Sequence, residues 1–133
     1  MNNKQNILKE RFDIQITEEN QLIKKEFELD HNAHYLIGIV LTSEFDELLY
    51  YRGTQRIHLN DRVLFPENYE SRLLMSGLNV SPNNRIVDTG TIPTGNSKLE
   101  VWYQDTPHEN TNFRPYRVSI YAYSITQTEE LNV

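Results

Sequence analysis

The sequence contains no cysteine, so neither a disulfide framework nor a thiolate metal site can form. It also lacks any apolar run near the ~20 residues that a membrane helix needs. The longest run, YLIGIVL at residues 35–41, has the length of a strand. The opening residues MNNKQNILKE have no apolar core region, so we expect no signal peptide. These absences predict a chain that is made in the cytoplasm and spans no membrane.

Signatures of catalysis and cofactor binding are missing as well. The chain has no Gly-x-Ser-x-Gly nucleophile elbow, no phosphate-binding loop and no dinucleotide fingerprint. His31 and His34 have the spacing of two metal ligands, but they fall in a predicted turn without a third ligand nearby. The acidic segment 44–47 lacks the pattern of a calcium loop. We therefore expect a non-enzymatic protein with no cofactor and no metal.

Positive charge is the scarcer sign. The chain has 13 Lys and Arg against 19 Asp and Glu, which gives a net charge of −6. Nucleic-acid binding depends on clustered basic residues, so we expect no nucleic-acid partner. Tyrosine, by contrast, is abundant, with eight residues. Tyrosine suits surfaces that become half buried, because its ring is apolar and its hydroxyl can form a hydrogen bond.

Alternation of apolar and polar residues predicts short strands over most of the chain. At 133 residues we expect one domain, with residues 1–11 as a polar N-terminal arm and residues 12–133 as the domain. Asn60-Asp61 predicts a hairpin turn, Pro66 is expected to end that hairpin, and 67–77 is the segment with helical character. The strands are expected at 11–17, 22–30, 35–43, 48–53, 55–59, 62–65, 86–87, 97–105 and 116–126.

About eight strands in one small domain indicate a sandwich or a barrel. The connections are long and uneven, which favours a Greek-key sandwich over an up-and-down barrel. We predict an all-β, eight-stranded antiparallel sandwich of the jelly-roll type. An immunoglobulin-like sandwich is the alternative, although its cysteine pair around a Trp is absent.

Tyrosine and arginine gather in two parts of the chain, and both types are enriched in protein interfaces. The competing interpretation is that the tyrosines cover the edge of the core and the arginines pair with carboxylates. Trp102 lies on the polar phase of its strand, so we expect it to face outward, where it suits a sugar contact or a subunit contact. If that phase is misread, Trp102 belongs to the core. The predicted interface residues are Tyr50, Tyr51, Arg52, Arg56, Arg62 and Tyr69 around the hairpin, and Arg117 and Tyr121 on the last strand.

The chain resembles the small single-jelly-roll structural proteins of bacteriophage virions, such as vertex, minor capsid and decoration proteins. The resemblance consists of the polar N-terminal arm, about eight strands across residues 12–125, long loops such as VSPNNRIVDTGTIPTGN, and no catalytic motif. It covers nearly the whole chain and transfers no site residue. It implies a virion protein that associates with itself, as a homo-oligomer, and with other virion proteins.

Two other classes of function stay open. A carbohydrate-binding or receptor-binding module on a spike or fibre would use Trp102, exposed tyrosines and the Asn-rich loops to bind a glycan. A small hydrolase or isomerase would need His58 or His108 in a concave cluster with carboxylates. The sequence does not bring such a cluster together.

Overall fold

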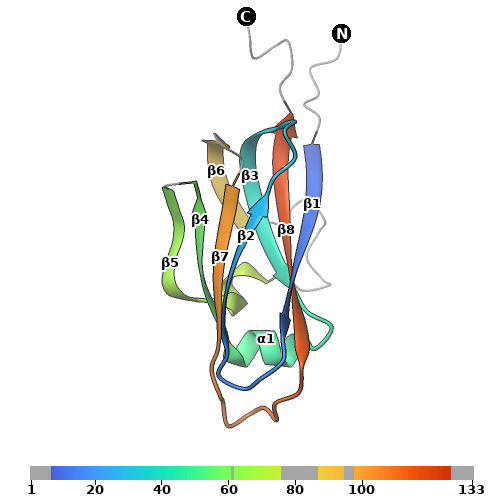
Figure 1. Cartoon of the computed structure of the whole chain (residues 1–133), viewed down its shortest axis with the longest axis vertical. Helices are drawn as coiled ribbons and strands as arrows, with labels where there is room; N and C mark the ends of the chain where they lie inside the picture. Colours follow the sequence, from blue (N-terminus) through green and yellow to red (C-terminus); the bar gives the residue numbers. More distant parts are fainter. Residues whose placement is uncertain (1–6, 61, 76–86, 95–97, 127–133) are drawn as a thin grey trace, which may run out of the picture.

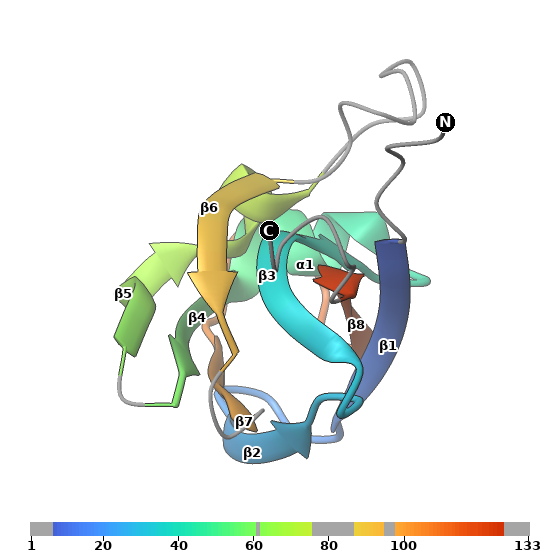
Figure 2. The ribbon, with the colours of Figure 1, turned by 90° about the horizontal axis from the view of Figure 1, so that it is seen from above.

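The protein is described by a computed structural model that covers residues 7–60, 62–75, 87–94 and 98–126. Its described part forms two four-stranded antiparallel sheets that pack face to face (Figures 1 and 2). One short helix and one 3₁₀ turn lie at one end of the sandwich (Figure 1). The elements are β1 (Ile7–Ile16), β2 (Leu22–Glu28), β3 (Ala33–Thr42), α1 (Asp46–Arg52), β4 (Gly53–Leu59), β5 (Arg62–Glu70), η1 (Ser71–Leu74), β6 (Val87–Pro93), β7 (Lys98–Asp105) and β8 (Tyr116–Thr126).

The strand order identifies the topology. The first sheet has the order β1-β8-β3-β6 and the second has the order β2-β7-β4-β5. Apart from the β4–β5 hairpin, each strand is followed in the chain by a strand of the opposite sheet. This pattern of two Greek keys is the jelly roll. The predicted fold class is therefore confirmed, and the immunoglobulin-like order is not the one found.

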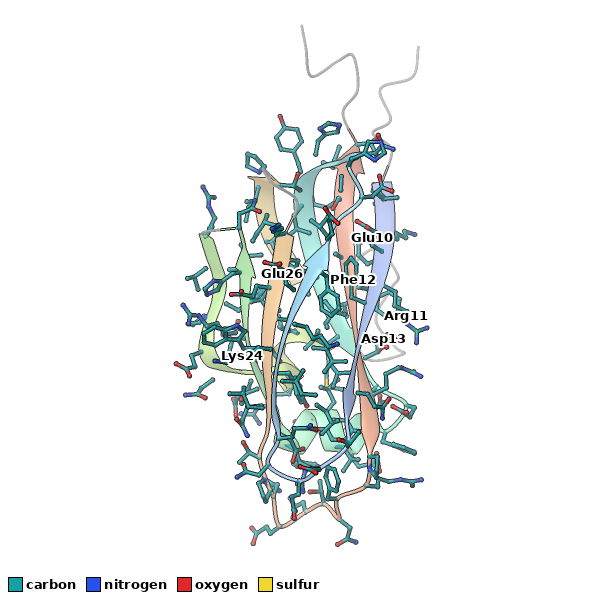
Figure 3. The ribbon with its side chains drawn as sticks, in the orientation of Figure 1. Glu10, Arg11, Phe12, Asp13, Lys24 and Glu26 are labelled. Atoms are coloured by element: carbon teal, nitrogen blue, oxygen red, sulfur yellow. The ribbon has the colours of Figure 1, made fainter. Side chains whose placement is uncertain are left out.

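The core lies between the sheets and follows the period-2 alternation. Val118 and Ile120 of β8 and Leu99 and Val101 of β7 are buried members of one hydrophobic cluster. At the open edge between β1 and β2, the ring of Phe12 stacks on the ring of Phe27, with 4.8 Å between the ring centroids. Figure 3 shows Phe12 on the β2 side of β1, with Arg11 and Asp13 on the other side.

The sequence predicts a strand over residues 48–53, but residues 48–52 form most of helix α1 and only Gly53 belongs to a strand, as the first residue of β4, so that prediction is wrong. The buried residues Leu48, Leu49 and Arg52 have helical spacing. Asp46 and Glu47 occupy the first turn and Arg52 the last, which is the charge order that the helix dipole favours. Helix α1 has only seven residues, so its helical periodicity is too short to be recognised in a run of apolar and aromatic residues that also fits a strand.

Two boundaries differ from the predicted ones, and one expected helical segment is found. Strand β1 begins at Ile7, so residues 7–11 of the expected arm belong to a strand, and residues 1–6 lie outside the described part. Strand β5 continues past Pro66 to Glu70, which an edge strand tolerates because it has a side without ladder hydrogen bonds. The helical character expected within 67–77 is confirmed as η1.

Candidate interaction site

The outer face of the second sheet carries a row of three side chains centred on Trp102. Lys24 of β2 and Arg56 of β4 lie directly opposite Trp102 in the two ladders that flank β7. The Lys24 Nζ lies 4.2 Å from the centroid of the indole ring and the Arg56 Cζ lies 4.8 Å from it. Such distances give cation–π attraction from both neighbouring strands. The outward position predicted for Trp102 is confirmed.

A shallow pocket adjoins this row. It holds about 310 Å³ of space, part of it open to solvent. Residues of all four strands of the sheet contribute, so the pocket spans the face rather than a single loop. The lining residues are Leu22, Thr54, Gln55, Arg56, Glu67, Asn68, Trp102 and Gln104.

A break in the β4–β5 ladder shapes one wall of the pocket. Gln55 pairs with Tyr69 and Ile57 with Phe65, so Arg56 alone lies opposite the three residues 66–68. Asn68 has a left-handed backbone with φ of 67°, which Asn tolerates better than most residues. The resulting bulge directs Glu67 and Asn68 toward the pocket. Bulges at sheet edges often re-aim side chains in this way.

A second candidate surface lies at the end of the sandwich that carries α1 and η1 (Figure 1). Tyr50 and Tyr51 are 45% and 42% exposed, and their rings lie edge to face at 4.9 Å. Tyr51 also contacts the ring of His108 at 4.9 Å, and the guanidinium of Arg72 lies 6.0 Å from the Tyr50 ring. Leu73 of η1 is exposed as well. We call these five residues the aromatic end patch.

Arg52, predicted as an interface residue, is buried with only 1% of its surface exposed. Its guanidinium donates to both carboxylate oxygens of Asp105, Nε to Oδ1 and Nη2 to Oδ2, each at 2.9 Å. It also donates to Thr111 Oγ1 at 3.0 Å and to Glu19 Oε1 at 3.1 Å. All its charge is used inside the fold, so the assignment of Arg52 to an intermolecular contact is wrong.

Two buried tyrosines extend this network into the core. The hydroxyl of Tyr116 donates to Asp105 Oδ1 at 2.6 Å, and it lies 2.9 Å from the hydroxyl of Tyr103. Burial raises the pKa of both tyrosines well above the ordinary value, so they stay neutral. Burial alone would raise the pKa of Asp105, but its hydrogen bonds from Arg52, Tyr116 and the Asn20 backbone N–H lower it. At neutral pH the network therefore holds a carboxylate–guanidinium ion pair.

The other predicted interface residues are spread over the molecule rather than gathered around the hairpin. Arg62 is exposed next to the hairpin turn. Tyr69 is half buried and packs on Phe65, with ring centroids 4.9 Å apart, so it serves the core edge. Arg117 and Tyr121 lie on β8 in the other sheet. Arg117 Nε donates to Ser119 Oγ at 2.9 Å, and Arg11 lies over the Tyr121 ring at 6.0 Å.

The histidines do not form a metal-binding cluster within the described residues. No group of three or more His, Asp or Glu side chains that could hold a metal ion occurs in that part of the chain. His58 Nδ1 lies 3.6 Å from Glu100 Oε1 on the outer face of the second sheet, and His108 packs on Tyr51. None of the described helices is long and apolar enough to cross a membrane.

Comparisons of this chain with protein-family models, with curated proteins and with solved structures find no match. Its function must therefore be inferred from its own residues.

Sequence reasoning missed the Lys24–Trp102–Arg56 row and the Arg52–Asp105 pair. The sequence contains a signal for the row, because Lys24, Arg56 and Trp102 all occupy the polar phase of their strands. Only the strand order, which the sequence does not give, makes them neighbours. No local signal exists for the Arg52–Asp105 pair, since its two residues lie 53 positions apart in the sequence.

Proposed function

We propose that this protein is a non-enzymatic structural protein that forms subunit contacts through the aromatic end patch, as a homo-oligomer within a phage virion. The observation that carries the proposal is the pair of exposed, mutually contacting rings of Tyr50 and Tyr51. The fold does not need these rings, since Leu48 and Leu49 of the same helix supply its buried face. Exposed aromatic clusters of this kind are typical of interface hot spots.

The charges in and around the aromatic end patch support association with a second copy of the chain. Asp46 and Glu47 lie in the first turn of α1, and Arg72, a member of the patch, lies over the Tyr50 ring. A surface with both signs of charge can complement itself, either about a two-fold axis or head to tail around a ring. Charge complementarity of this kind fixes the register and partner choice more than the affinity.

The virion setting rests on the fold. Jelly rolls recur in viral capsid subunits, and also in lectins and cupins, so the strand order supports this setting only by analogy. Within this setting, Arg62 at the hairpin and Arg117 and Tyr121 on β8 remain predicted contacts to other virion proteins. The protein would reach the virion after synthesis in the host cytoplasm.

The test is the mass of the protein in solution, measured by size-exclusion chromatography with light scattering over a range of protein and salt concentrations. We expect a defined oligomer. The double variant Tyr50→Ser/Tyr51→Ser should dissociate at a protein concentration at least roughly tenfold higher than the wild type, because it removes two ring contacts per subunit.

Val63→Ser is the matched control. Val63 is 48% exposed, which is close to the exposure of the two tyrosines, but it lies on β5 near the hairpin turn. Its variant should keep the wild-type mass. A strict monomer under every condition, or an unchanged oligomer in the tyrosine variant, would count against the proposal. Dissociation of the Val63 variant alone would also count against it, because the contact would then lie at the hairpin.

A further inference from the structure

The pocket beside Trp102 has the composition of a ligand site, and nothing in the fold requires it. We infer that it binds a single sugar residue that carries a carboxylate, such as a uronic or sialic acid. This inference does not rest on self-association, because the pocket and the aromatic end patch share no residue. Either one can fail while the other holds.

The first argument is charge without a counter-ion. Within the described residues, the side chains of Lys24 and Arg56 form no ion pair and no hydrogen bond, and each lies over the Trp102 ring. Arg11, Arg52 and Arg72, by contrast, are each paired with a carboxylate within 3.1 Å. Two unpaired cations held at one point of a chain with net charge −6 are an attractive place for an anion.

The second argument is the mixture of groups around the pocket. Arg56 can hold a carboxylate with two parallel hydrogen bonds, since its guanidinium is free of other acceptors. The side chains of Thr54, Glu67 and Asn68 have no hydrogen-bond partner within the described residues and offer both donors and acceptors. A pocket that needed only a small anion would not contain Glu67. Hydroxyl groups, by contrast, can donate to that carboxylate while the ligand's own carboxylate lies toward Arg56.

The third argument is shape and rigidity. The pocket is shallow and part of its space is open to solvent, so it can contact one face of a single ring but cannot enclose a chain of sugars. The indole of Trp102 is flanked by Lys24 and Arg56 in the two neighbouring strands, so it loses little side-chain freedom when a ligand contacts it. Gln104 is fixed too, because its Nε2 donates to the carbonyl oxygens of Asn20 and Asp105 at 3.2 and 2.7 Å.

The experiment uses the full chain and its single tryptophan. The indole N–H resonance and the fluorescence of Trp102 are followed while N-acetylneuraminic acid, glucuronic acid, glucose, N-acetylglutamate or acetate is added. We expect a saturable change with at least one carboxylated sugar, and binding roughly tenfold weaker or more for glucose, because a charge-assisted hydrogen bond is lost. N-acetylglutamate and acetate should bind more weakly than that sugar.

The variants locate the site. Arg56→Gln should weaken the binding of the carboxylated sugar roughly tenfold, and Lys24→Gln should weaken it by a smaller factor. Arg72→Gln is the matched control, because Arg72 also lies over an exposed aromatic ring, that of Tyr50, but belongs to the aromatic end patch. It should bind like the wild type.

Three results would overturn the inference. One is the absence of a saturable response to either carboxylated sugar. Another is equal binding of acetate or N-acetylglutamate, which would show a general carboxylate site. The third is unchanged binding in Arg56→Gln and Lys24→Gln, both of which keep the fold if their thermal unfolding matches that of the wild type.

Discussion

Arg52, the last residue of α1, and Asp105, the last residue of β7, form a two-point ion pair with both N–O distances at 2.9 Å. Neither side chain is exposed beyond 1%. The pair ties the helix to the end of the central strand β7 and, through Thr111 and Tyr116, to the start of β8. Buried charges of this kind are weak evidence for net stability, but removal of one partner is costly.

Asp105→Asn should lower the free energy of unfolding by about 3 kcal/mol, because it leaves the buried Arg52 guanidinium without its main counter-charge. Glu19→Gln is the natural control. Glu19 accepts from the same Nη2 atom at 3.1 Å, but its side chain is 55% exposed. Glu19→Gln should lower the free energy of unfolding by much less, because water can replace the lost contact. Urea denaturation of both variants measures the difference, and equal losses would contradict the assigned role of burial.

The same carboxylate predicts how stability depends on pH. The pKa of Asp105 is lower in the folded protein than in the unfolded chain. Its contribution is therefore fully present above the unfolded value of about 3.9, and it is lost as the pH falls toward the folded value. The difference in unfolding free energy between the wild type and Asp105→Asn should be constant near neutral pH and shrink below about pH 4. A difference that stays constant down to about pH 3 would refute this.

The strands were predictable because burial imposes a period of two, as in Leu99, Val101 and Tyr103, which are all buried with Trp102 outside. Helix α1 was not, because Leu48 and Leu49 read equally well as a buried strand. The site residues were predictable in type but not in place. Arg52 and Arg56 are separated by three residues, yet one lies in the core and the other on the outer face, because α1 ends and β4 begins between them.

Gly53, at this junction, should tolerate no side chain. A Cβ atom there would lie closer than 3.0 Å to the Tyr103 hydroxyl, to Ser71 Oγ and to the carbonyl oxygen of Leu49. The Leu49 carbonyl cannot move away, because it accepts the hydrogen bond from the Gly53 N–H that ends the helix. Gly53→Ala should therefore cost about 3 kcal/mol through overpacking. Thr54→Ala, on the outer face of the same strand, should cost far less in the same thermal or urea unfolding measurement.

Glu10 should show the opposite pH behaviour to Asp105. It lies on the inward phase of β1, where its Oε2 accepts the Asp30 N–H at 2.9 Å and its buried Oε1 has no hydrogen-bond partner among the described residues. Burial raises the pKa of Glu10 above its ordinary value, and the nearby Asp30 carboxylate adds to the effect. The neutral form of Glu10 therefore contributes stability that is fully present below the unfolded pKa and is lost as the pH rises through the folded pKa.

The variant Glu10→Gln has no carboxylate to ionise at this position. It should therefore unfold at a higher temperature than the wild type near neutral pH, and this advantage should vanish near pH 4. Glu18→Gln, in an exposed turn, should leave the unfolding temperature unchanged at both pH values. A Glu10→Gln variant that is less stable than the wild type near neutral pH would show that the carboxylate is held by a partner that favours its charge.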